Sequence, residues 1–353
     1  MVSSPRSRCD GMTVLDTLGM FDAAYGLAEQ VETAAAALAA GVDGLPAADE
    51  VSNVLVLGMG GSGISGDVLS AVAGPICSVP ILVSKDYELP GFVDAGTLVF
   101  AVSFSGNTEE TIESATEAAH AGAKVVTVSA GGRLAELGVT WGAPHVSLPG
   151  DIVMPRAAIG AASVPLLLML GQVGLCGGVE AEIDATVKQL RHRRDELSKS
   201  RNIAEELARH IGRTFPLVYG GGPIGAVAAQ RWKGEFNENA KAPAFANRVP
   251  EACHNEAAGW GQHGDVTRQV FTLIFLRHDH EHPQVARRFD LLRELMLEVV
   301  ASIHVVSAQG DGLMAQLFDL VFVGDLVSLH LAAQQEVDPG PIPALEFIKA
   351  GLR

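Results

Sequence analysis

A repeated order of apolar run, glycine-rich turn and helical pattern constrains the fold of this 353-residue chain more than any other feature. The first such unit has an apolar run at 54–57, glycines at 58–63 and a helical pattern at 64–72. Further strand-like runs lie at 81–84, 98–102 and 124–128. Strands that alternate with helices are joined by right-handed βαβ crossovers, so this half of the chain predicts a parallel sheet.

The same order begins again in the second half. An apolar run at 215–219 leads into glycines and a helix, and later strands are predicted at 270–276, 304–306 and 320–323. The chain therefore predicts an α/β fold with two domains, each a mostly parallel sheet flanked by helices. The expected organisation is an N-terminal helical segment at 1–48, a first domain at 49–178, a linking helix at 179–212 and a second domain at 213–353.

Hydroxyl side chains gather where the third predicted strand gives way to a helix. Ser103, Ser105 and Thr108 occupy this junction. The first N–H groups of a helix are unpaired and carry partial positive charge, so the position suits a phosphate group. In the alternative, Asn107 and Glu110 form a capping box, which would not explain three hydroxyls.

The glycine-rich turn before the first helix adds a second phosphate-binding element. Gly58, Gly60 and Gly63 have the spacing of a dinucleotide fingerprint, which is a weak signal alone. Two neighbouring turns at the carboxyl ends of parallel strands instead favour one small phosphate, and the second half has no counterpart of the hydroxyl segment. The residues predicted to bind this phosphate are Gly60, Gly61, Ser62, Ser103, Ser105 and Thr108.

Charge and composition exclude several classes of partner. The net charge is −16 and no Lys/Arg-rich block is present, so nucleic acid is not expected as a partner. Four scattered cysteines and a polar start to the chain predict a reduced, cytoplasmic protein. The uncharged run at 157–178 is long enough for a membrane span, but its proline and glycines favour a buried helix.

Five segments together carry a family resemblance. They are Gly58-Met59-Gly60-Gly61-Ser62-Gly63, Ser103-Phe104-Ser105-Gly106-Asn107-Thr108, Asn237-Glu238-Asn239-Ala240-Lys241, Pro250-Glu251-Ala252-Cys253-His254-Asn255-Glu256 and Gly259-Trp260. The chain resembles the bifunctional phosphoglucose/phosphomannose isomerase family, which has two sugar isomerase (SIS) domains. That resemblance implies an aldose–ketose isomerisation of hexose 6-phosphates, without metal or organic cofactor, in a homodimer with shared active sites.

The resemblance also implies which residues do the chemistry. Glu238 matches the family's catalytic base, although Glu235, Glu251 and Glu256 lie nearby and spacing alone does not choose among them. His254 matches the histidine that opens the hexose ring, and in the family it comes from the neighbouring subunit.

Two cations complete the set of catalytic residues that the resemblance implies. Arg156 matches an arginine beside the enediolate, where a guanidinium stabilises an oxyanion. Lys349 resembles an active-site lysine near the C-terminus. The alternative for Arg156 is a salt bridge, and for Lys349 a solvated terminal lysine.

Two features do not follow simply from the resemblance. Gly340 stands where members of the family commonly have a threonine close to the sugar, so the preference for glucose or mannose stays open. The cluster His278-Asp279-His280-Glu281-His282 suggests a metal site, but its place between a strand and Pro283 favours an exposed turn.

Two other functions remain to be weighed against the isomerase. A non-catalytic SIS protein that senses a sugar phosphate would keep the hydroxyl segment and could lose the base and the histidine. A dinucleotide-dependent oxidoreductase is disfavoured by the hydroxyl segment. Because Glu238, His254 and Arg156 are all present, the enzyme is the leading hypothesis.

Overall fold

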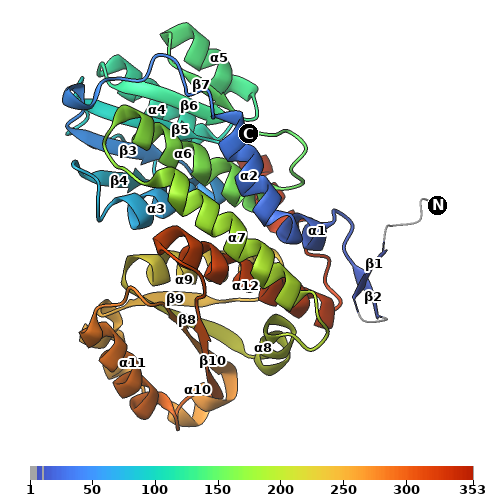
Figure 1. The fold of residues 1–353 in the computed structure, drawn as a ribbon. Coiled ribbons are helices and arrows are strands. Elements are labelled where there is room, and N and C mark those ends of the chain that lie inside the picture. Colours follow the sequence, from blue (N-terminus) through green and yellow to red (C-terminus); the bar gives the residue numbers. More distant parts are fainter. Residues whose placement is uncertain (1–5, 10–11, 353) are drawn as a thin grey trace. The chain divides into compact units, whose positions relative to one another are not determined.

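The computed structural model describes residues 6–9 and 12–352. The chain folds into two compact units. One unit spans residues 26–188, and the other joins the residues up to 25 to those from 189 onward (Figure 1). Each unit is built around its own sheet.

The unit at 26–188 holds a five-stranded sheet of order β4-β3-β5-β6-β7 in which every neighbouring pair is parallel. Its strands are β3 Asn53–Leu57, β4 Ile81–Ser84, β5 Thr97–Val102, β6 Lys124–Ser129 and β7 His145–Ser147. Its helices are α2 Leu27–Ala37, η1 Ala48–Glu50, α3 Gly60–Ala73, α4 Glu109–His120, α5 Gly132–Trp141, η2 Pro155–Ala158 and α6 Ile159–Val173. The predicted parallel sheet is confirmed here.

Alternating side chains of the buried strands divide between the two faces of this sheet. Leu55, Leu57, Val99 and Ala101 share one core cluster with residues of α4 and α5. On the other side α3 contacts α6, and α6 contacts α2. Helices on both faces explain why these strands are apolar throughout.

The second unit holds a four-stranded parallel sheet of order β11-β10-β8-β9. Its strands are β8 Phe215–Gly221, β9 Phe245–Val249, β10 Phe271–Arg277 and β11 Ser302–Ser307, with an antiparallel pair β1 Arg6–Cys9 and β2 Met12–Leu15 elsewhere in the unit. Its helices are α1 Met20–Tyr25, α8 Ile203–Ile211, α9 Gly222–Glu238, η3 Glu251–His254, η4 Glu256–Gly259, α10 Gly264–Val270, α11 Pro283–Met296, α12 Leu313–Gln334 and α13 Pro343–Gly351. The helix α7 Val179–Leu197 runs across the boundary at 188.

Two predicted helical segments differ from the structure. The segment 1–48 is not helical throughout, because residues 6–9 and 12–15 pair as strands. Its first helix begins only after Asp16, whose carboxylate accepts hydrogen bonds from the amides of Met20 (2.8 Å) and Phe21 (3.1 Å). The linking segment 179–212 is two helices rather than one.

The break between α7 and α8 has a local cause. Arg201 has a left-handed backbone with φ +58°. Asn202 then caps α8, since its side-chain oxygen accepts from the amides of Ala204 (2.9 Å) and Glu205 (3.0 Å). An asparagine in this position starts a new helix.

The strand predicted at 320–323 is wrong, because these residues lie inside α12. A helix that is buried on all sides has an apolar sequence without helical periodicity, so it resembles a buried strand.

Two helices, α6 with its preceding turn and α12, are long and apolar enough to cross a bilayer. In the 18-residue apolar window of each, 78% and 94% of the window is buried inside the protein. The predicted buried helix at 157–178 is thus confirmed as α6, and α12 is a second core helix of the same kind.

The sequence does not predict the edge strands β7 and β9, because both are short and mix polar with apolar residues.

Candidate functional site

The turn between β5 and α4 leaves the start of its helix without a side-chain cap. Thr108 is the N-cap residue, and no described side chain accepts a hydrogen bond from the first turn of α4. The side chain of Asn107 points elsewhere: its oxygen accepts from the amide of Arg133 (3.1 Å) and its nitrogen donates to the carbonyl of Ser105 (3.0 Å). The capping box of Asn107 with Glu110 is therefore wrong, and capping does not account for the hydroxyls.

The hydroxyls of this turn lie close together. Ser103 Oγ, which is fully buried, and Thr108 Oγ1 are hydrogen-bonded at 2.8 Å. Ser62, from the glycine-rich turn, accepts a hydrogen bond through its Oγ from the amide of Phe104 (3.0 Å). Ser105 is exposed beside them. The two turns thus contact each other directly.

The glycine-rich turn supplies a second helix start at the same edge of the sheet. Helix α3 begins at Gly60, and none of the side chains described in the structure caps it. Since β3 and β5 are parallel neighbours, α3 and α4 both begin at the carboxyl edge of the sheet. We call Gly60, Gly61, Ser62, Ser103, Ser105 and Thr108 the cradle. Two positive helix ends and several hydroxyls are the chemistry that binds a phosphate group.

Arg156 lies in the short helix η2, which packs against the cradle. Its side chain is only 2% exposed. A β-carbon placed on Gly61 would lie 2.9 Å from the carbonyl oxygen of Pro155 and 3.0 Å from the Cα of Arg156. The backbone of this turn therefore approaches α3 so closely that only glycine fits there. The structure brings Arg156 together with the cradle in one unit.

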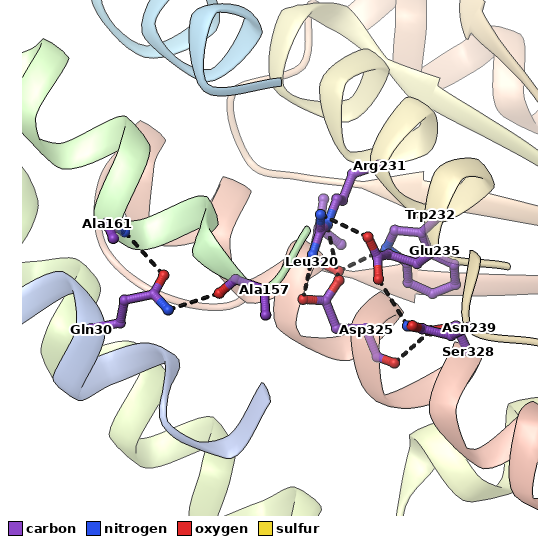
Figure 2. A network of polar contacts seen from close by, with 10 residues as sticks. All are labelled: Gln30, Ala157, Ala161, Arg231, Trp232, Glu235, Asn239, Leu320, Asp325 and Ser328. Carbon is purple, nitrogen blue, oxygen red and sulfur yellow. Dashed lines mark hydrogen bonds and ion pairs between the residues drawn. The ribbon is translucent and has the colours of Figure 1, made fainter. Parts of the chain in front are cut away.

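Gln30 of α2 binds the residues that follow Arg156, as Figure 2 shows for Ala157 and Ala161. Its Nε2 donates to the carbonyl oxygen of Ala157 (2.8 Å), and its Oε1 accepts from the amide of Ala161 (3.0 Å). These two bonds fix the start of α6 next to Arg156. Sequence reasoning missed Gln30, because a glutamine within an alanine-rich helix gives no local signal.

A cation also stands beside the glycine-rich turn. Lys85 forms an ion pair with Asp67 of α3, and its Cε would lie 3.1 Å from a β-carbon on Gly63. Burial raises the pKa of Asp67, although Lys85 opposes this shift. The Lys85–Asp67 ion pair thus lies against the glycine-rich turn.

The candidate base lies in the other unit, at the end of α9. Glu238 is the last residue of this helix and is half-buried. The helix follows directly after the glycine turn that ends β8, as the sequence predicts. The structure thus confirms the helical setting of Glu238.

One of the competing carboxylates, Glu235, is committed to a buried network (Figure 2). Its Oε1 lies 2.7 Å from Arg231 Nη1, and its Oε2 accepts from Asn239 Nδ2 (2.8 Å). Arg231 also makes two bonds to Asp325 of α12 (3.0 and 3.1 Å). Burial alone would lower the pKa of Arg231, but the two carboxylates outweigh it and the pKa is raised. This network attaches α9 to α12. Each carboxylate oxygen of Glu235 is already in a buried contact, which disfavours Glu235 as the catalytic base.

The other two glutamates differ from each other. Glu256 accepts hydrogen bonds from the hydroxyl of Tyr219 and the side chain of Asn247, one on each oxygen. Burial and this carboxylate raise the pKa of Tyr219. Glu251 is exposed and accepts from Asn255 Nδ2 (2.9 Å). Contacts with neighbouring side chains thus disfavour Glu235 and Glu256 as the base, and the candidates that remain are Glu238 and Glu251.

His254 and Lys349 are exposed on the same unit as Glu238. His254 ends the short helix η3, and Lys349 lies on α13, of which no described residue is buried. The structure does not bring these two side chains into a closed site with Glu238.

Side chains of the same unit pack against the glycine turn between β8 and α9. His278 Nε2 lies 2.7 Å from the carbonyl oxygen of Gly221, and Glu281 accepts a hydrogen bond from the amide of His278 (3.1 Å). The Glu281 carboxylate would lie 2.9 Å from a β-carbon on Gly221, and it is paired with Arg277 (2.8 Å). The His278 and Glu281 side chains thus lie against the glycine turn before α9, close to where an anion at this helix start would bind. Among the described residues, the glycine turn of the unit at 26–188 is therefore the better candidate for binding an anion.

The segment 278–282 is not a solvated turn throughout, which corrects that expectation. His278 is only 7% exposed, and its pKa is lowered, chiefly by burial. Asp279, His280 and His282 are exposed. Among residues 6–9 and 12–352, no three histidine, cysteine or acidic side chains are grouped as metal ligands.

Comparisons with known proteins show which family the chain resembles. The chain matches the SIS domain family over residues 49–135 and the bacterial phospho-glucose isomerase C-terminal SIS domain over residues 200–352. The bifunctional phosphoglucose/phosphomannose isomerase of Caldicellulosiruptor bescii is 34% identical over 334 residues, which cover 94% of this chain and 98% of that protein. The enzyme of the same name from Thermoplasma acidophilum is 34% identical over 300 residues, covering 84% and 89%.

A solved structure supports the fold. A glucose-6-phosphate isomerase-like protein from Thermus thermophilus superposes with a TM-score of 0.57 at 19% identity and covers 96% of this chain and 99% of its own. At that identity the likeness concerns the fold alone.

Proposed function

The chain belongs to the bifunctional phosphoglucose/phosphomannose isomerase family, with two SIS-type domains, and we propose how its residues carry out the reaction. It is a phosphosugar isomerase that interconverts an aldose 6-phosphate, glucose or mannose, with fructose 6-phosphate. The reaction moves one proton between C2 and C1 of the open sugar through an enediolate. A second proton moves between the two neighbouring oxygens, so atoms and charge balance without a cofactor.

The observation that carries the substrate assignment is the cradle. It combines two helix starts that no described side chain caps with the hydroxyls of Ser62, Ser103, Ser105 and Thr108. We assign the sugar's phosphate to this edge, held by the backbone amides of Gly60 and Gly61 and by the hydroxyls of Ser62, Ser103, Ser105 and Thr108. Hydrogen bonds to a charged group stabilise by about 1.5–3 kcal/mol each, so a few of them suffice for micromolar affinity.

Glu238 is the base in this proposal. Glu238 matches the position of the family's catalytic base and is half-buried at the end of a helix that a buried network holds. Both carboxylate oxygens of Glu235 and of Glu256 are in internal contacts. Glu238 takes the proton from C2 of the aldose and returns it to C1. A positioned base of this kind contributes roughly 10²–10⁴ in rate.

The remaining roles follow the chemistry of each side chain. Arg156, held against the cradle, stabilises the negative oxygen of the enediolate through its fixed N–H donors. His254 exchanges protons with the ring oxygen and the anomeric hydroxyl, which opens the ring. Lys349 adds a second positive charge near the reacting oxygens.

We also propose that the enzyme works as a homodimer with His254 supplied by the neighbouring subunit. The exposure of His254 and of Lys349 in the single chain supports this arrangement. Cytoplasmic localisation is part of the proposal and is supported by the free thiols of Cys77, Cys176 and Cys253 among the described residues.

The test combines a coupled assay with isotope exchange. Purified protein is assayed with mannose 6-phosphate, glucose 6-phosphate and fructose 6-phosphate. Alanine at both Ser105 and Thr108 is expected to raise KM about tenfold or more. Glu238→Gln is expected to lower kcat about 10²-fold with KM little changed, and to reduce solvent deuterium incorporation at C1 and C2.

Each part of the proposal has its own contradicting result. An unchanged KM in the Ser105/Thr108 variant removes the cradle as the phosphate site, and normal turnover by Glu238→Gln transfers the role to Glu251. Tight binding without turnover or exchange in the wild type identifies a sensor instead of an enzyme. Mixed Glu238→Gln and His254→Ala subunits restore activity if the site is shared. Confirmed subunit exchange without recovery excludes sharing.

A further inference from the structure

Lys241 joins the end of the base-carrying helix to a distant loop. It lies three residues after Glu238 and has a left-handed backbone with φ +52°. Its Nζ lies 2.8 Å from the carbonyl oxygen of Glu238 and 3.4 Å from that of Asn239. The same atom lies 2.8 Å from the carbonyl oxygen of Asp338 and 3.0 Å from that of Pro339. One ammonium group therefore bridges the C-terminus of α9 and the loop between α12 and α13.

The loop at this bridge is itself anchored. Asp338 Oδ1 accepts hydrogen bonds from the amides of Gly340 (3.0 Å) and Thr17 (3.4 Å), and its Oδ2 accepts from Thr17 Oγ1 (2.6 Å). Leu18 then packs on Gly340, where a β-carbon would lie 2.7 Å from Leu18 Cγ. Hydrogen bonds thus join three segments that are far apart in sequence. We call the three residues that join them, Thr17, Lys241 and Asp338, the Lys241 clasp.

We infer that Lys241 is a positioning residue for the base Glu238, a conclusion that rests on the proposed role of Glu238. The buried network of Arg231, Glu235 and Asn239 holds α9 to α12 through side chains. Lys241 instead binds the backbone carbonyl oxygen of Glu238 (2.8 Å). The last carbonyls of a helix have no partners within the helix and favour a cation. Lys241 therefore holds the final turn of α9, and with it the direction in which the Glu238 side chain leaves the helix.

The expected effect is on turnover more than on folding. Lys241 is exposed, so removing its charge opens no cavity in the core. Displacement of a catalytic group by about 1 Å can lower a rate by about 10²-fold, and loosening one helix turn displaces Glu238 by less. The phosphate is assigned to residues of the other unit, so KM does not depend on the clasp.

The experiment compares Lys241→Met with Lys199→Met, an exposed lysine of the same unit, in the complete protein. Lys241→Met keeps the length of the side chain but cannot donate hydrogen bonds. We expect kcat to fall roughly tenfold with KM within about twofold, while Lys199→Met matches the wild type. Lys241→Arg, which can still donate to several carbonyls, is expected to recover most of kcat.

A double mutant separates this inference from the base assignment. If Lys241 acts through Glu238, then Lys241→Met causes no further loss in the Glu238→Gln background. Losses that multiply, or a kcat for Lys241→Met equal to that of Lys199→Met, overturn the positioning role. Normal activity of Glu238→Gln alone overturns the base assignment, and with it the idea that Lys241 acts by placing a base. A Lys241→Met variant that loses its thermal transition shows a role in folding and also overturns the inference.

Discussion

Gly61→Ala tests whether the close backbone contact between the cradle and the turn of Arg156 is needed for stability and activity. A β-carbon at this position would lie 2.9 Å from the Pro155 carbonyl oxygen and 3.1 Å from the amide nitrogen of Arg156. Ordinary contacts begin at 3.4 Å, so one backbone segment must retreat by roughly 0.5 Å. Both partners are backbone atoms, which cannot move aside as a flexible side chain could.

The size of the effect follows from these contacts. Overpacking of this kind costs about 1–3 kcal/mol. The helix preference of alanine over glycine offsets at most about 1 kcal/mol of that. A loss of 1 kcal/mol lowers Tm by about 2–4 °C for a unit of this size, so we expect a decrease of several degrees. Because Arg156 moves away from the cradle, kcat/KM should fall by about tenfold or more.

The assay is thermal unfolding together with steady-state kinetics on fructose 6-phosphate. Gly234→Ala is the matched control, since Gly234 also lies within a helix and its added β-carbon meets no described atom within 4 Å. That variant should be at least as stable as the wild type. If Gly61→Ala has the Tm and kcat/KM of the wild type, then the turn adapts freely and the close approach has no functional meaning.

Three further predictions concern other parts of the chain. Gln30→Leu should lower the free energy of unfolding by about 1–3 kcal/mol, since it leaves two backbone groups beside the Arg156 turn without partners, and an unchanged urea midpoint would contradict this. Gly340→Thr should lower Tm, and Leu18→Ala in the same chain should recover part of it; additive losses would show that the two residues do not compete for space. Burial, and repulsion from His210, lower the pKa of His304, so the unfolded chain binds that proton more readily and stability falls as the pH drops below about 6.5. His304→Gln should weaken this decline in Tm, and an identical pH profile would refute the assignment.

Local sequence determined the parallel sheets and the place of the cradle. Apolar runs rich in β-branched residues mark β3, β5 and β6, and each is followed by a turn and a helix, so the crossovers and the parallel order follow from general rules. Once β3 and β5 are neighbours, Ser62 and Ser103 must lie at one edge. That inference needs only strand direction, which the chain order supplies.

Sequence alone misassigned elements whose environment differs from what their composition suggests. The run at 320–323 reads as a strand, yet it belongs to α12, which is buried on all sides and has no polar face to reveal its period. The edge strand β9 pairs with β8, but its polar residues interrupt the apolar pattern from which a strand would be predicted.

The folded structure, and not the sequence, reduced the four glutamates to Glu238 and Glu251 as candidate bases. Glu235, Glu238 and Glu256 are chemically the same group, and the structure shows Glu235 bound to Arg231 and Asn239 and Glu256 bound to Tyr219 and Asn247. Arg231 and Asn239 lie one helical turn from Glu235, whereas Tyr219 at Glu256, Asp338 at Lys241 and the Ala157 carbonyl at Gln30 come from distant parts of the chain. A side chain's role depends on which groups the fold places within about 3 Å of it, and no local pattern records that distance.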